Sequence, residues 1–239
     1  MASSAKRLKR AKVQSGPDFT GTTRAVRVED EIFQIHQKLA CATSDFFKND
    51  ASIVAIDIEQ NPIRIHGHTT ATFRIYLTWL YTKQIGHIID MKYMWHTMVR
   101  AFLMGITLLD TTFHNAVVAS MTQRACVGGY PDLSIVKEVY VGTSKGASIR
   151  NLLVDICAIK RPTLLDKIRD PAAEMHGDFV NDLLRASFKP PMSRSVDEKP
   201  WLTDPHRYLE VAGQAVAVPN NPQRSMTAFD TSSGLQPMR

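Results

Sequence analysis

The sequence predicts an α+β protein with a small sheet at the front and a cluster of α-helices behind it. Two patterns lead to this fold class. Between residues 25 and 65, short segments alternate apolar and polar residues, as strands with one buried face do. From residue 70 onward, apolar residues recur at steps of three and four, the period of an amphipathic helix. The chain has 239 residues, of which 44% are hydrophobic, and can therefore bury a core of this kind.

The predicted sheet begins with a hairpin. Residues 25–29 alternate, and residues 32–35 follow across an acidic turn at residues 29–31. Phe33 and Ile35 are spaced by two, so we expect both on one face of the second strand.

Further short elements follow the hairpin. Ser44 is expected to open a short helix over residues 45–48. Residues 53–58 are a third strand candidate, and Asn61-Pro62 breaks it before a small strand at residues 63–65.

Six amphipathic segments predict the helical part. Thr70 is expected to cap the first helix, Gly105 to end the second, and Asp178 to cap the last. Their apolar positions are, in chain order, Phe73, Tyr76, Leu77 and Leu80; Met91, Met94, Trp95, Met98 and Phe102; Phe113, Ala116, Val117 and Met121; Ile135, Val136, Val139 and Tyr140; Ile149, Leu152, Leu153 and Ile156; and Phe179, Val180, Leu183 and Leu184.

The two ends differ in composition from the middle. Residues 1–23 have few large apolar groups and predict a disordered basic arm. Residues 189–239 contain seven prolines and predict a mostly disordered tail, in which Trp201 and Tyr208 mark short docking segments. We expect the chain to keep a soluble, cooperatively melting domain when residues 1–22 and 190–239 are removed.

The net charge of +6 is concentrated in the arm. The rest of the chain is close to balanced, so the folded part is not expected to bind polyanions in general. Short basic clusters occur as nuclear-import signals, as nucleic-acid arms and as solubilising tails, and nothing aromatic is interleaved here to favour DNA contact. The candidate import cluster consists of Lys6, Arg7, Lys9, Arg10 and Lys12.

Cysteine usage and hydropathy place the chain inside the cell, in the nucleus or cytoplasm. Cys41, Cys126 and Cys157 are odd in number, far apart and set among apolar neighbours, which is typical of reduced, mostly buried thiols. No apolar run approaches the roughly 20 residues of a membrane-spanning helix, and we do not expect a membrane partner.

Metal or catalytic chemistry is not predicted. His66 and His68 form an H-x-H pair and His36 lies near Cys41, but neither group has the three or four suitably spaced ligands that a metal site needs. Surface or capping histidines and an inert thiol are the expected roles. With no catalytic residue, cofactor or metal assigned, we do not expect an enzyme.

Two further patterns have ordinary structural interpretations. The glycine-containing segments 127–130 and 141–146 lack the spacing of a phosphate loop and predict turns between helices. The methionines at 91, 94, 98 and 104 could form an adaptable binding face, but their interleaving with aromatic residues favours a core.

Five segments, in chain order, are similar to motifs of one family. Together these segments resemble BTB/POZ domains of the fungal type, over roughly residues 25–160. They are Phe33-Gln34-Ile35-His36-Gln37-Lys38-Leu39, similar to F-x-V-H-K-x-L-L; Ser44-Asp45-Phe46-Phe47, similar to S-x-x-F; residues 73–82, similar to F-x-x-x-L-x-W-L-Y-T; residues 109–118, similar to L-x-D-x-x-F-x-N-A-V; and residues 139–155, similar to V-Y-x-x-T…S-x-x-R-x-L-L-V-D.

The resemblance implies a BTB/POZ-like domain over residues 24–127 with a C-terminal helical extension over residues 128–188. It implies a non-catalytic protein–protein interaction module whose partners are other proteins. A recruitment adaptor, such as a substrate adaptor of a cullin ubiquitin ligase, is a narrower form that the family permits. The alternative is a nuclear regulator that contacts nucleic acid through its basic arm.

One departure from the family concerns self-association. Many members pair an acidic residue on the first strand with a basic residue directly after the histidine. Here Gln37 follows His36, and the first strand offers Arg27 and Glu29. A lone buried acid facing a neutral glutamine would be costly, so the charged pocket is expected to be absent or rebuilt with neutral hydrogen bonds. We therefore expect a monomer or weak dimer.

The predicted core follows from these elements. We expect fourteen apolar side chains to be largely buried in one contiguous core. They are Phe33, Ile35, Leu39, Phe47, Phe73, Leu77, Leu80, Phe102, Leu109, Phe113, Val117, Leu152, Leu153 and Ile156.

Overall fold

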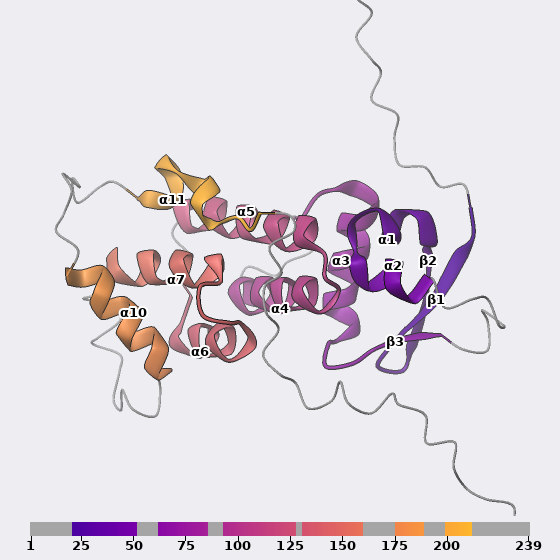
Figure 1. Ribbon diagram of the computed structural model, residues 1–239, viewed down its shortest axis with the longest axis horizontal. Helices are drawn as coiled ribbons and strands as arrows, with labels where there is room; N and C mark the ends of the chain where they lie inside the picture. Colours follow the sequence, from indigo (N-terminus) through magenta and orange to yellow (C-terminus); the bar gives the residue numbers. More distant parts are fainter. Residues whose placement is uncertain are drawn as a thin grey trace, which may run out of the picture. The chain divides into compact units, whose positions relative to one another are not determined.

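The computed structural model describes residues 21–51, 62–85, 93–127, 131–159, 175–188 and 199–211 (Figure 1). The chain divides into two compact units, Met1–Ile85 and Gly86–Arg239. The described residues form a three-stranded sheet and otherwise helices, so the α+β prediction is confirmed. The boundary between the units lies inside the stretch 24–127 that we predicted as one domain.

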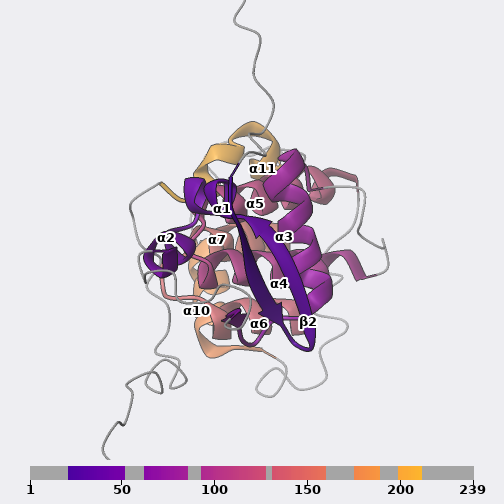
Figure 2. The same cartoon turned by 90° about the vertical axis from the view of Figure 1, so that its right-hand side faces the viewer.

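The first unit is built on the predicted hairpin (Figure 2). Strand β1 (Thr23–Val28) pairs antiparallel with β2 (Glu31–His36), and Glu29 makes the turn with a left-handed φ of 51°. Strand β3 (Ile63–Ile65) pairs parallel with β1, which gives the strand order β2-β1-β3. The candidate strand 53–58 lies outside the described residues.

One face of this sheet is apolar and covered. Val26, Val28 and Ile35 have no exposed surface, and the ring of Phe33 packs edge-on against Phe73 at 5.0 Å. Phe73 belongs to helix α3 (Thr70–Thr82), which begins one residue earlier than predicted. Thr69, not Thr70, is the N-cap, because its hydroxyl accepts the Thr72 N–H.

Two short helices complete the first unit. Helix α1 (Gln37–Thr43) starts directly after β2, and α2 (Asp45–Ala51) opens at Ser44 as predicted. The Ser44 hydroxyl accepts the Phe47 N–H at 3.3 Å and so caps α2. Phe47 then stacks on Tyr76 of α3 at 6.3 Å, which ties the helix pair to the unit's core.

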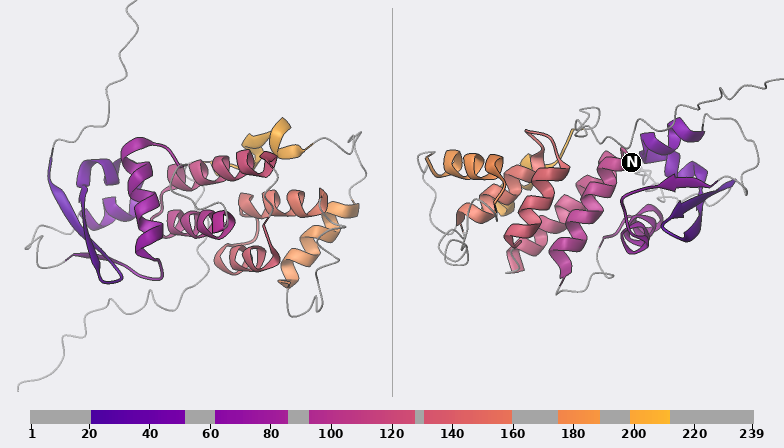
Figure 3. Two further views of the ribbon diagram at one scale, coloured as in Figure 1. Left: turned by 180° about the vertical axis from the view of Figure 1, so that it is seen from behind. Right: turned by 90° about the horizontal axis from the view of Figure 1, so that it is seen from below.

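The second unit is helical in its described part, and Figure 3 shows its helices from two further sides. It contains α4 (Met94–Thr107), α5 (Thr111–Val127), α6 (Leu133–Gly142), α7 (Ser148–Ile159), α10 (Gly177–Phe188), α11 (Pro200–Thr203) and the 3-10 helix η2 (Pro205–Tyr208). Helix α4 packs on α5 and α6, and α10 packs on α7 and α6. No helix in the described stretches is both long and apolar enough to cross a membrane.

Two predicted helix ends are wrong. Gly105 does not end α4 but lies buried inside it, where an added Cβ would meet the Cβ of His114 at 2.7 Å. The missing side chain lets α5 approach α4 closely, and this packing outweighs the poor helix propensity of glycine. Asp178 does not cap α10 but lies in its first turn, because the helix already begins at Gly177.

Arg150 is buried and organises the turn between α6 and α7. Its guanidinium donates to the Tyr140 carbonyl and to the Thr143 hydroxyl, both at 2.9 Å, and to the Thr143 carbonyl. The turn predicted over residues 141–146 is confirmed for residues 143–146, whereas residues 141 and 142 belong to α6.

The predicted tail is folded at residues 199–211. Trp201 of α11 is 1% exposed and Tyr208 of η2 has no exposed surface. These segments pack on α5 and α7 (Figure 1). Trp201 and Tyr208 thus lie in docked segments, as expected. That a cooperatively melting domain remains when residues 190–239 are removed stays a prediction, and the burial of these two side chains argues against it. The rest of the tail lies outside the described residues.

Most of the predicted core is confirmed. Ten of the fourteen side chains are buried, and Phe33, Leu39, Leu77 and Leu109 are partly exposed. The fourteen positions divide between the two units, seven in each. Met94, Met98 and Met104 are also buried, which confirms a core role for them; Met91 lies outside the described residues.

Candidate interaction site

The junction between β2 and α1 carries the histidine of the resemblance. The Tyr81 hydroxyl accepts the His36 backbone N–H at 3.2 Å and lies 2.9 Å from the ring Nδ1. His36 occupies the N-cap position of α1, but its side chain makes no capping hydrogen bond. His36 therefore does not cap α1 with its side chain but contacts a tyrosine of α3 at this junction.

Gln37 is held by neutral hydrogen bonds. Its backbone N–H donates to the Thr22 carbonyl at 3.0 Å, and the Thr22 hydroxyl donates to its side-chain Oε1 at 3.1 Å. This is one of the two arrangements expected when glutamine replaces a basic residue. The charged residue of β1 that lines the same small cavity as Gln37 is Arg24, not an acid.

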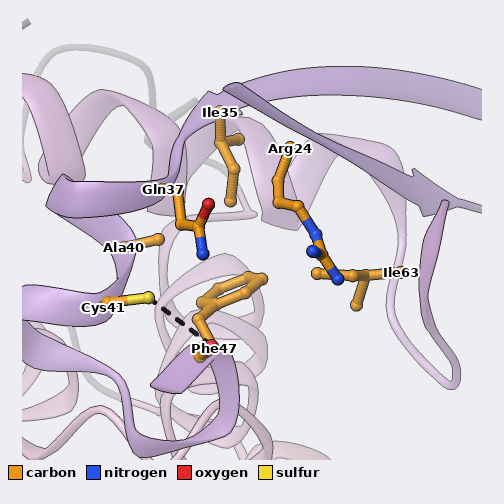
Figure 4. A pocket seen from close by; sticks show the side chains of 7 residues that line it. All are labelled: Arg24, Ile35, Gln37, Ala40, Cys41, Phe47 and Ile63. Carbon is orange, nitrogen blue, oxygen red and sulfur yellow. Dashed lines mark hydrogen bonds between the residues drawn. The ribbon is translucent and has the colours of Figure 1, made fainter. Parts of the chain in front are cut away.

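A small cavity lies beside Gln37 (Figure 4). It has a volume of about 10 Å³, enough for one water-sized probe and for no larger ligand. Cys41 at its wall donates its thiol to the Phe47 carbonyl at 3.5 Å. The cavity is therefore a small packing gap and not a ligand site. It is lined by Arg24, Ile35, Gln37, Ala40, Cys41, Phe47 and Ile63.

The outer edge of β2 is the side of this strand that faces away from β1. Residues of an antiparallel pair alternate between hydrogen-bonded and non-hydrogen-bonded positions. Gln37 bonds to Thr22 on the β1 side, whereas His36 sends its N–H outward to Tyr81. By alternation, Gln34 and Ile32 also direct their backbone groups away from β1. Within the described residues, β2 is an edge strand of the sheet.

The side chains of β2 differ between its two faces. Toward α3, Glu31 forms an ion pair with Arg74, and the Arg74 guanidinium lies 5.3 Å from the centre of the Phe33 ring. On the opposite face, Ile32 is 51% exposed and Gln34 is exposed. The strand is thus anchored through one face, while two side chains on its other face are exposed.

The remaining residues singled out in the sequence have separate positions. His66 and His68 follow β3, and no cluster of three potential metal ligands occurs in the described ranges. Cys157 is buried, and burial raises its pKa to about 12, which keeps the thiol protonated. Lys6, Arg7, Lys9, Arg10 and Lys12 lie outside the described residues.

Two features of the site were not predicted. The contact between His36 and Tyr81 joins residues 45 positions apart, and no periodicity signals it. The outward direction of Gln34 depends on the hairpin register, which the sequence leaves open. No protein-family model matches this chain, and a search of the curated proteins finds no match either.

Proposed function

We propose that this chain is a non-catalytic, intracellular protein–protein interaction module with a BTB/POZ-like fold. The observation that carries the proposal is the anchored edge strand β2, which pairs on one side only within the described residues and whose backbone groups at Ile32 and Gln34 point away from β1. An extended segment of a partner adds to such an edge by main-chain hydrogen bonds, while neighbouring side chains give specificity.

The family resemblance supports the same proposal. Its first motif spans the β2–α1 junction, its second spans the Ser44 cap of α2, and its third spans α3. The fourth and fifth fall on α5 and on α6–α7. A recruitment adaptor, for example for a cullin ubiquitin ligase, is the narrower form of this proposal.

The geometry of β2 suits a guest strand. Because Arg74 and Phe73 already hold the side chains of β2, the strand loses little conformational entropy when a partner binds along its edge. The exposed Ile32 offers apolar area beside the backbone groups, and the charged Glu31 at the strand's start opposes indiscriminate edge pairing.

Affinity capture followed by mass spectrometry tests the proposal. The wild-type chain is expected to retain a reproducible set of proteins, and Ile32→Asp is expected to lose most of that set, because a charge then faces the incoming strand. Leu202→Asp is the matched control, since Leu202 is 55% exposed and lies on α11. Equal capture by wild type and Ile32→Asp would count against the proposal. Cullin subunits in the set would favour the adaptor form.

A further inference from the structure

The sheet register places two arginines directly opposite each other. Arg27 of β1 pairs with Arg64 of β3 in the parallel ladder. Like charges at directly opposed positions of neighbouring strands destabilise a sheet. A chain that keeps such a pair gains stability whenever an anion lies between the two guanidinium groups.

The two arginines line a surface pocket of about 160 Å³. The Nε of Arg27 is buried and has no hydrogen-bond partner in the part of the chain that the structure describes. Within the described residues, neither guanidinium forms an ion pair or a hydrogen bond. The volume is below that of a pocket for a drug-sized ligand and suits a compact anion.

Glu29 lines the same pocket but is engaged elsewhere. Its carboxylate accepts the Thr70 backbone N–H, at the start of α3, at 2.9 Å. One carboxylate against two guanidinium groups leaves the pocket with a net positive charge.

The segment that follows β3 contributes two polar side chains to the pocket wall, and the glycine between them leaves space beside the backbone. His66 and His68 flank Gly67, which has a left-handed φ of 78° and open space where a Cβ would lie. Burial lowers the pKa of His68, so its ring is neutral at pH 7 and contributes a hydrogen-bonding group instead of a charge.

We propose that the pocket formed by Arg27, Arg64, His66 and His68 binds a phosphate monoester group. Guanidinium groups match phosphate in geometry, since each can donate two parallel N–H bonds to its oxygens. The phosphate would offset the repulsion between the paired arginines.

The source of the phosphate rests on the proposed function. If the chain binds proteins, the group is carried by a phosphorylated side chain of the partner. The affinity of the pocket for phosphate itself does not depend on that proposal.

Thermal unfolding of the full chain in increasing inorganic phosphate tests the pocket, with sodium chloride of matched ionic strength as the reference. Ligand that binds only the folded state raises the midpoint with concentration, and the series yields the Kd. Arg64→Gln and Arg27→Gln are each expected to weaken phosphate binding at least about tenfold, as expected for lost charge-assisted hydrogen bonds. Arg74→Gln removes one positive charge from the other face of the sheet and is expected to leave the Kd unchanged.

Arg64 is exposed, so its replacement is not expected to compromise folding. In chloride, Arg64→Gln is expected to melt at or above the wild-type midpoint, because the like-charge pair is gone; in phosphate it is expected to lose the wild-type gain. No stabilisation beyond the chloride reference, or an equal response from Arg64→Gln and wild type, would overturn the inference. A phosphate response combined with partner capture that is insensitive to Ile32→Asp would uphold the pocket and reject the proposed function.

Discussion

Replacing Trp201 with alanine tests whether the C-terminal segment is part of the folded second unit. Trp201 lies on the four-residue helix α11 and is 1% exposed. A buried tryptophan removes roughly 150–250 Å² from water, which at about 25 cal/mol per Å² corresponds to about 4–6 kcal/mol. Measured Trp→Ala substitutions in cores cost roughly 3–5 kcal/mol. We expect a loss in this range.

Two further variants separate packing from other effects. The Nε1 of Trp201 is buried and has no hydrogen-bond partner among the residues that the structure describes, so Trp201→Phe removes an unsatisfied donor while it keeps an aromatic ring. We expect it to cost clearly less than Trp201→Ala. Leu202 is 55% exposed on the same helix, and Leu202→Ala is expected to change the free energy of unfolding by no more than about 0.5 kcal/mol.

Urea denaturation followed by circular dichroism measures all three variants. The expected order of destabilisation is Trp201→Ala, then Trp201→Phe, then Leu202→Ala. If Trp201→Ala lowered the free energy of unfolding by less than about 1 kcal/mol, the segment would not contribute to the fold. The expectation from composition, that the domain folds without the tail, would then hold.

The remaining predictions concern the core, pH and self-association. Phe73 has no exposed surface, and Phe73→Ala is expected to cost roughly 3–5 kcal/mol in urea denaturation, where a loss below about 1 kcal/mol would argue against a core position. Burial lowers the pKa of His114 from 6.5 to about 4, an effect that Glu210 only partly offsets. Between pH 6.5 and pH 4 the unfolded chain therefore binds a proton at His114 that the folded chain does not bind. The contribution of His114 to the free energy of unfolding is complete above pH 6.5 and falls by roughly 3 kcal/mol as the pH is lowered toward 4. His114→Gln should reduce this decrease. In light scattering coupled to size exclusion, the chain is expected to be a monomer or weak dimer at micromolar concentration; a dimer that survives dilution to nanomolar levels would contradict this.

Local patterns predicted the front of the fold well. The hairpin, the Ser44 cap and the short strand at residues 63–65 follow from alternation and breakers within a few residues. Such patterns depend only on residues that are close in sequence, so they can be recognised without the tertiary structure. The one-residue error at Thr69 is of the size expected when two adjacent threonines can both cap a helix.

Features that depend on long-range contacts were missed. Gly105 looked like a helix end because its role, admitting His114 of the next helix, is tertiary. Residues 199–211 belong to a stretch, residues 189–239, whose seven prolines predicted a mostly disordered tail. Two buried aromatic side chains, Trp201 and Tyr208, and the hydrogen bonds of Glu210 nevertheless hold this segment against the helices. The Glu210 carboxylate accepts from the backbone and hydroxyl of Ser148, both at 2.8 Å.

The candidate site shows the same division. His36 and Gln37 could be singled out from the resemblance, but their partners Tyr81 and Thr22 could not. The opposition of Arg27 and Arg64 arises only from the parallel register of β1 and β3, which no short-range pattern specifies.

Comparing Gln34→Pro with Gln34→Ala tests the interaction edge most directly. Both changes remove the same side chain, but only proline removes the outward N–H, and it leaves the ladder to β1 unbroken because Gln34 occupies a non-hydrogen-bonded position. Affinity capture with each variant, after both are shown to melt cooperatively, is expected to retain the partner set with Gln34→Ala and to lose it with Gln34→Pro. The same partner set on both variants would contradict an interaction module that binds through the edge of β2.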